Sequence, residues 1–426
     1  MSATILEMAA SEACWQEFLE YKLERQHLDA RQEREIRDYI VRKAYQPLCE
    51  ACKKGEFPTS YPVKKTVNKQ ATGKKRIVYT FPGDEGIMLK FIAFHLFYYD
   101  DYFNNNCYAF RRKFGVQNAI RRIRNLPDLE KQYCLKVDIS NYFNSINVDR
   151  LLEKLTFVRR EDEALYGIFK RILQREHVME NGRLVSEPHG AMAGTPLSPF
   201  FANVYLREVD AYFDDMNIAY FRYSDDILIF APTERELNQC KERLFSMIED
   251  LDLAVNPDKI HVSAPGEVWE FLGFSYRKGE IDLSDMTMRK TMAKIRRKAD
   301  ALRRWQRKKG LTGEKAAIGL IRAMNHKFYG RPVKSSNESM EDGYDSDQDI
   351  KSLTESSDFT WSRWFFPNIT VDDGLHRIDT YFQEYIRYTV TGRHYKGNYR
   401  INYEQLKNWG YRSLVHEFYR SKKENC

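Results

Sequence analysis

The chain has 426 residues, which is enough for two or three separately packed lobes, and its hydrophobic content of 42% can build packed cores. The formal net charge is +7, but residues 335–358 hold eight acidic residues and one lysine, a net −7, which leaves +14 on the remainder. A basic body of this size favours a polyanionic partner, and nucleic acid is the usual one.

The cysteine spacing and the length of the apolar runs argue against a zinc-binding or membrane-spanning protein. The seven cysteines are scattered, and Cys49 and Cys52 are the only close pair, without further ligands at zinc-site spacing. We therefore expect reduced thiols. The longest apolar stretch, residues 87–99, is too short to span a bilayer and contains Lys90 and His95. No signal peptide opens the sequence, so we expect a cytoplasmic protein with no membrane partner.

The first half of the chain alternates helical and strand patterns. Residues 1–50 are rich in Glu, Arg and Leu with apolar positions at helical spacing. Residues 58–81 carry β-branched and aromatic residues around a turn signal, which predicts a hairpin whose basic tip includes Lys74, Lys75 and Arg76. Residues 85–100 favour a buried helix and residues 116–124 a basic one. Residues 133–140 predict a short strand that ends in Asp138.

The second half continues with a predicted helix over 148–173, a Gly/Pro-rich loop over 181–199 and a helix over 199–214. Two short strands, 218–223 and 227–231, flank Ser224, Asp225 and Asp226, and an amphipathic helix follows over 234–251. Beyond residue 285 the chain is basic and helical. The acidic, Ser-rich segment 335–358 is expected to be disordered, and an aromatic-rich helical region resumes after it.

The three aspartates at these strand ends form a candidate catalytic site. If Asp138, Asp225 and Asp226 converge, they repel one another unless a dication lies between them. Hard oxygen ligands suit Mg²⁺, and two such ions form the clamp for in-line phosphoryl transfer. Two adjacent aspartates are also common in ordinary turns, so the accompanying motifs decide between these interpretations.

Six segments resemble, in order, the motifs of reverse transcriptases. Tyr223-Ser224-Asp225-Asp226 resembles the family's Tyr-x-Asp-Asp hairpin. The other five segments are CYAFRRKFGVQNAI (107–120), LKVDISNYFNSI (135–146), GTPLSPFFANVYL (194–206), NPDKIHV (256–262) and the primer grip FLGF (271–274). The resemblance extends from about residue 70 to 310 and implies RNA-directed DNA synthesis from dNTPs.

The resemblance also implies roles for individual residues. Asp138, Asp225 and Asp226 would be catalytic and would bind two Mg²⁺ ions, with Mn²⁺ as an alternative, helped by the main-chain carbonyl of Ile139. Phe143 would be the steric gate that excludes a 2′-hydroxyl. The other expected nucleotide-binding residues are Lys74, Lys75, Arg76, Gly194, Pro196 and Lys259, of which Lys259 would protonate the leaving pyrophosphate. The expected nucleic-acid contacts are Arg111, Arg112, Phe271, Leu272, Gly273, Arg296, Arg297, Arg303 and Arg304.

The implied fold class is α+β. A right-hand polymerase would combine fingers and a palm, built on a small antiparallel sheet, with an α-helical thumb and a C-terminal helical extension. The expected divisions are an N-terminal helical segment (1–60), fingers and palm (61–280), a basic thumb (281–334), the acidic insertion (335–358) and the extension (359–426).

Departures from the family pattern narrow the lineage. Ala193 stands where the family usually has Gln before Gly194, and this variant resembles the bacterial defence-associated (unknown-group and abortive-infection-like) enzymes, relatives of group II intron and retron enzymes. A retron enzyme would be shorter and would carry an Asn-Ala-x-x-His segment that is missing here. The resemblance implies a structured non-coding RNA template, an RNA–DNA duplex product and a role in antiphage defence. Template-independent or protein-primed synthesis, an RNA-binding scaffold with a vestigial site, and homo-oligomerisation are left open.

Overall fold

The computed structural model describes the chain except residues 1–2, 27, 29, 69–74, 331–359 and 425–426. The described residues form two compact units, which meet in sequence between Pro265 and Gly266. The acidic segment 335–358 lies outside the described residues. No helix in the described ranges is both long and apolar enough to cross a membrane.

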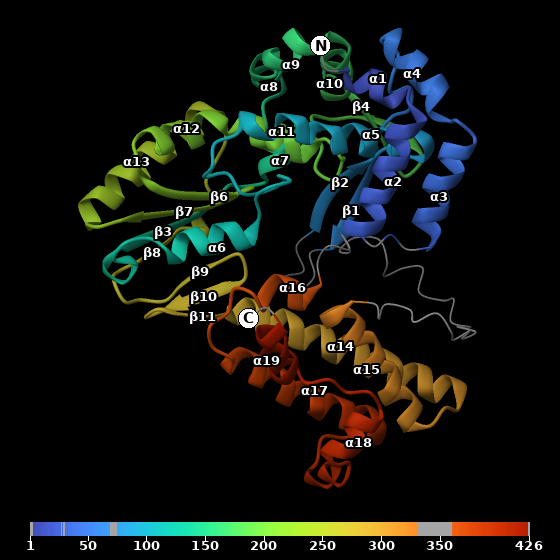
Figure 1. Cartoon of the computed structure of the whole chain (residues 1–426), viewed down its shortest axis with the longest axis vertical. Helices are drawn as coiled ribbons and strands as arrows, with labels where there is room; N and C mark the ends of the chain where they lie inside the picture. The colour runs from blue at the N-terminus through green and yellow to red at the C-terminus, as the bar shows by residue number, and fades with distance from the viewer. Residues whose placement is uncertain (1–2, 27, 29, 69–74, 331–359, 425–426) are drawn as a thin grey trace. The chain divides into compact units, whose positions relative to one another are not determined.

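The first unit begins with the predicted helical region and then forms two four-stranded sheets (Figure 1). Its helices are α1 (Ile5–Ala9), α2 (Glu12–Gln26), α3 (Ala30–Val41), α4 (Tyr45–Lys53), α5 (Gly83–His95), α6 (Val116–Arg124), α7 (Tyr142–Ser145), α8 (Val148–Lys154), α9 (Thr156–Glu161), α10 (Glu163–Leu173), α11 (Ser198–Tyr205), α12 (Arg207–Asp215) and α13 (Glu234–Asp250). Short 3₁₀ turns cover Leu96–Tyr102, Leu129–Lys131 and Pro257–Lys259.

One sheet has the order β2-β1-β4-β5 and contains the predicted hairpin. Strands β1 (Val63–Asn68) and β2 (Lys75–Thr80) are antiparallel, so the hairpin is confirmed, while its tip falls outside the described residues. Strands β4 (His177–Glu180) and β5 (Arg183–Ser186) form a second hairpin within a region that the sequence predicted to be partly loop. Its turn, Asn181-Gly182, has positive φ at both residues, the conformation that Asn-Gly turns favour.

The other sheet carries the three aspartates and has the order β6-β7-β3-β8. Its strands are β3 (Tyr133–Asp138), β6 (Ala219–Tyr223), β7 (Asp226–Ala231) and β8 (His261–Ser263). The apolar side chains of the central strands, such as Leu135, Val137 and Ile229, are fully buried. Helix α13 packs against β3 and β7, and α12 packs against β6. The strands around the aspartates are therefore held in a core, as their patterning predicted.

The predicted helix over 148–173 is wrong in one respect, because the segment forms three helices. The chain leaves helical geometry at Asp162, whose φ and ψ are −145° and 89° and whose carboxylate accepts the main-chain N–H of Leu165 at 2.9 Å. Asp162 thus caps a new helix rather than continuing the old one. The predicted helix over 199–214 is likewise divided at Leu206 into α11 and α12.

The second unit begins with a three-stranded sheet, β9 (Trp269–Phe271), β10 (Phe274–Arg277) and β11 (Glu280–Leu283). The helices that follow are α14 (Asp285–Lys309), α15 (Gly313–Tyr329), α16 (Trp361–Phe365), α17 (Asp373–Thr391), α18 (Tyr403–Asn408) and α19 (Leu414–Glu424). Helices α14, α15 and α17 pack on one another around buried residues such as Ile295, Leu320 and Phe382. The predicted α+β class, with a basic helical region near the C-terminus, is confirmed.

Candidate active site

The three aspartates meet at one end of the β6-β7-β3-β8 sheet. The register of β3 and β7 puts Asp138 opposite Asp226. Ser224 and Asp225 form the turn between β6 and β7, and Ser224 has a φ of 63°, in the left-handed region that tight hairpin turns require. The main-chain N–H of Ile139 donates to the carbonyl of Asp225 at 3.2 Å, which ties the end of β3 to this turn.

Burial and like charge act together on these carboxyls. Burial raises the pKa of Asp225, and the neighbouring Asp138 raises it further. Burial also raises the pKa of Asp226 to about 6, against the opposing effect of Lys136. Lys259 lies at the same place, with its Nζ 2.5 Å from Oδ1 of Asp138. Three carboxylates thus face two ammonium groups, and an excess of negative charge remains when all are ionised.

This donor set fits a hard dication. No group of three or more His, Cys, Asp or Glu side chains is arranged as a complete metal site within the described ranges. Asp138, only 5% exposed, nevertheless interacts with Asp225 strongly enough to raise the pKa of that carboxyl, and a divalent cation would relieve this repulsion. Asp138 and Asp225 are therefore candidate ligands for a metal ion, and water or substrate oxygens would have to complete its shell.

The predicted nucleotide-binding residues are only partly within the described chain. Lys74 lies outside it, and for Lys75 the structure describes the strand position only. Arg76 is exposed on β2, and its guanidinium carbon lies 6.0 Å from the centre of the Phe143 ring. The structure therefore brings Arg76 and Phe143 together, although they come from the β1–β2 hairpin and from α7.

The segment around Gly194 lies against the same hairpin. Gly194 has a φ of 97°, and a Cβ there would lie 3.0 Å from the Cβ of Val78, so glycine is required by conformation and by close approach. The carbonyl of Ala193 accepts the N–H of Tyr79 at 2.8 Å, and the N–H of Ala193 donates to Oδ1 of Asn144 at 2.9 Å. Ala193 is buried, so its methyl group provides no contact for a substrate, whereas Pro196 is half-buried.

Arg111 corrects the sequence interpretation. Its side chain is 2% exposed, and its guanidinium donates to the carbonyls of Asn104 and Asp100 at 2.7 Å and of Cys107 at 3.0 Å. A guanidinium used in this way stabilises the local loop and is not available to template phosphates. Its neighbour Arg112 is exposed, as a phosphate contact requires.

The second unit requires similar corrections. Phe271 of the predicted primer grip is fully buried, so its ring belongs to the core rather than to a nucleic-acid surface. Arg303 donates to the carbonyls of Tyr388 and Thr389 at 3.2 Å each and thereby satisfies the last turn of α17. The remaining predicted contacts of this unit are the exposed Arg296, Arg297 and Arg304 of α14, and the half-buried Leu272 and Gly273.

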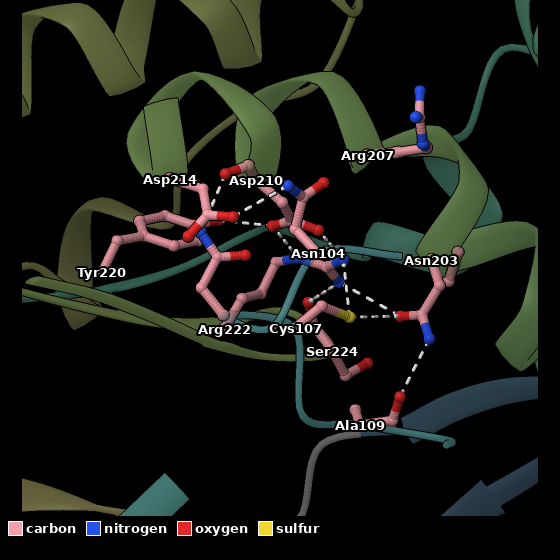
Figure 2. Close-up of polar contacts among 12 residues, drawn as sticks. Asn104, Cys107, Ala109, Asn203, Arg207, Asp210, Asp214, Tyr220, Arg222 and Ser224 are labelled. Atoms are coloured by element: carbon pink, nitrogen blue, oxygen red, sulfur yellow. Dashed lines mark hydrogen bonds and ion pairs between the residues drawn. The ribbon is translucent and has the colours of Figure 1, made fainter. Parts of the chain in front are cut away.

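A buried polar network behind the aspartate turn was missed by the sequence reasoning (Figure 2). The side chains of Arg222 and Asp210 are 0% and 1% exposed and form a two-point ion pair, with Nε to Oδ1 at 2.7 Å and Nη2 to Oδ2 at 2.5 Å. The guanidinium also donates to the carbonyl of Ser224 at 3.2 Å. Other contacts of the pair involve Asn203, Cys107 and Tyr220.

This network links the turn to three other segments of the first unit. Asp210 lies on α12, Asn203 on α11 and Cys107 on the segment that runs beside β6. Since Arg222 holds the carbonyl of Ser224, the network fixes the main chain directly before Asp225. A signal was available in the sequence: an arginine within the apolar strand β6 (Ala219–Tyr223) must be paired if it is buried.

Comparison with solved structures finds telomerases. The apo telomerase of Candida tropicalis truncated from its C-terminal domain has a TM-score of 0.41 and 14% identity over 52% of this chain and 55% of that chain. The telomerase of Candida albicans in complex with a TWJ fragment of telomeric RNA also has a TM-score of 0.41, with 12% identity over 87% of this chain and 68% of that chain.

Curated relatives and a protein family match the sequence itself. The Retron Ec86 reverse transcriptase of Escherichia coli is 21% identical over 40% of this chain and 50% of its own length. The Retron Ec83 reverse transcriptase of the same organism is 30% identical over 25% of this chain and 34% of its own length. The chain thus spans half or less of these relatives. Residues 64–276 match the family described as reverse transcriptase (RNA-dependent DNA polymerase), which is half of the sequence. With this match over the residues that build the aspartate site, the chain belongs to the reverse transcriptase family.

Proposed function

We propose that the protein is an RNA-directed DNA polymerase whose active site is the aspartate cluster of the β6-β7-β3-β8 sheet. The observation that carries this proposal is the register of β3 and β7, which sets Asp138 beside the Asp225–Asp226 turn. The family match over residues 64–276 supports the same activity.

In this proposal Asp138 and Asp225 bind Mg²⁺, with Asp226 and the carbonyl of Ile139 nearby. Bound Mg²⁺ ions would supply activation of the primer 3′-hydroxyl and charge stabilisation on the leaving pyrophosphate. Arg76 offsets negative charge on the triphosphate, and Phe143 packs under the sugar and leaves no room for a 2′-hydroxyl. The Lys259 ammonium group lies beside Asp138 and donates a proton to the leaving pyrophosphate.

The template is proposed to be a structured RNA, and the biological role to be antiphage defence. Two observations support an RNA partner: exposed arginines on α14 of the second unit, and similarity to enzymes named for retrons. Protein-primed synthesis is the second candidate, favoured by exposed tyrosines in the second unit. They are Tyr395, Tyr399, Tyr403 and Tyr419.

The test is primer extension on a defined RNA template with wild type, Asp225→Ala and the matched control Asp101→Ala. The Asp101 side chain is 89% exposed and belongs to the 3₁₀ turn Leu96–Tyr102, which contributes no residue to the proposed site, so its removal should leave activity unchanged. We expect Asp225→Ala to abolish extension. Extension by Asp225→Ala at the wild-type rate would refute the assignment.

Sequencing of the RNA and DNA that co-purify from cells then tests the template. One dominant RNA with complementary DNA supports templated synthesis. Absence of that complementary DNA from Asp225→Ala cells would show that this site makes it. DNA covalently linked to the protein would instead support the second candidate. Loss of phage protection with Asp225→Ala, but not with Asp101→Ala, is expected for the defence role.

A further inference from the structure

Phe110 is an exposed aromatic residue held in a strained conformation. The residue is 42% exposed, whereas its neighbours Ala109 and Arg111 are 0% and 7% exposed as whole residues. Its φ is 59°, in the left-handed region that bulky side chains rarely adopt. Such strain persists only where the surrounding structure enforces it, and it is concentrated at functional sites.

The register of the main chain puts Phe110 at the aspartate end of the sheet. Cys107 forms a parallel bridge with Arg222 of β6, and the N–H of Tyr108 donates to the carbonyl of Arg222 at 2.9 Å. Because the two segments run in the same direction, the residues after Tyr108 pass the end of β6 together with the Ser224–Asp225 turn. Phe110 therefore lies at the same end of the sheet as Asp225.

The residues on both sides of Phe110 are fixed. Asn203 donates its Nδ2 to the carbonyl of Ala109 at 2.8 Å (Figure 2). On the other side, the buried guanidinium of Arg111 makes its three bonds to main-chain carbonyls. The two anchors hold the strained residue between them, so the orientation of the Phe110 ring is built into the first unit.

The ring of Phe110 completes a continuous set of contacts. Its centre lies 6.3 Å from that of Phe143 and 6.5 Å from that of Tyr223. Phe143 in turn lies under Arg76 at 6.0 Å. From Arg76 through Phe143 to Phe110, the order is a cation followed by two rings. A nucleoside triphosphate has a matching order of anionic phosphates, sugar and stacking base.

We propose that Phe110 is a substrate-contacting residue whose ring packs against the base of the incoming nucleotide. The inference rests on the proposed polymerase function and deepens it. The ring stacks on any of the four bases, because every base has a π-face, and the contact supports binding without reading sequence.

The experiment measures single-nucleotide incorporation at saturating primer and RNA template while the dNTP concentration is varied. For Phe110→Ala we expect the KM for dNTP to rise about tenfold or more, with a smaller change in kcat, from the loss of base stacking. Phe110→Tyr keeps the ring and should restore a KM close to wild type. Tyr98→Ala is the matched control, because Tyr98 is 62% exposed and has no place in the site.

Binding measurements separate the alternatives. We expect the Kd for the primer–template duplex to be unchanged in Phe110→Ala. A raised duplex Kd with an unchanged dNTP KM would show that the ring contacts the template strand and would overturn the inference, as would no change in either constant.

If the wild type extends no primer, the polymerase proposal fails. Equilibrium binding of a fluorescent dNTP to wild type and Phe110→Ala then decides the inference, with about tenfold weaker binding expected and equal binding refuting it.

Discussion

The buried Arg222–Asp210 pair allows a quantitative test of how the aspartate turn is supported. Both side chains are almost fully buried and are joined at two points. Asp210→Leu leaves the Arg222 charge without its partner, and Arg222→Met leaves the Asp210 charge alone. Because an uncompensated buried charge is strongly destabilising, each single change should cost about 3–5 kcal/mol.

The double variant should cost less than the sum of the two single variants. It buries no charge, but it leaves the hydroxyl of Tyr220 and the carbonyl of Ser224 without their partners. Each orphaned polar group costs about 1–3 kcal/mol, which gives about 2–6 kcal/mol. Additive single effects would give about 6–10 kcal/mol. The double variant should therefore be more stable than additivity predicts, by several kcal/mol.

Hydrogen exchange measures this difference in the first unit alone, through the free energy of opening in peptides that cover residues 219–231. Cys107→Ser serves as the control, because it alters the contacts of Sγ with Arg222 and Asn203 without changing the formal charges of the network. Additive costs in the double variant would refute the reasoning. Since Arg222 also holds the carbonyl of Ser224, the double variant should extend primers more slowly, by roughly 10–100-fold.

The remaining predictions concern separate parts of the first unit. Phe143→Val should weaken discrimination against ribonucleotides by about 10–200-fold, measured as the ratio of kcat/KM for dNTP and rNTP, and unchanged discrimination would exclude a steric gate. The Arg111 guanidinium lies 3.9 Å from the carboxylate of Asp100, and both side chains are buried. Arg111→Met should therefore destabilise the first unit by about 3–5 kcal/mol, because the Asp100 charge would stay buried without its partner. Arg112→Met should keep stability and reduce the slope of log K for RNA binding against log salt concentration by about one. If Arg112→Met lost stability and Arg111→Met changed the salt dependence of RNA binding, Arg112 would be the structural residue and Arg111 the RNA contact. Gly194→Ala should cost about 1–3 kcal/mol in thermal or denaturant unfolding, because of its φ of 97° and the nearby Val78, and a stable variant would contradict this.

The sequence alone determined the central features of the site. The runs of apolar residues in β3, β6 and β7 predicted these strands to within about two residues, because only extended, buried segments satisfy that patterning. The position of Asp138 at a strand end and of Asp225 at a turn followed from the same patterns. The Asn181-Gly182 turn was also available as a signal and was not used.

Only the tertiary structure decided which charged residues are used up in internal contacts. Arg111 and Arg303 satisfy main-chain carbonyls within their own units, while Arg222 lies fully buried against Asp210. A local sequence pattern records that a residue is charged, but its partner is brought close by packing of segments far apart in the chain. The same long-range packing presents Phe110 beside Phe143, and no local pattern around residue 110 indicates that contact.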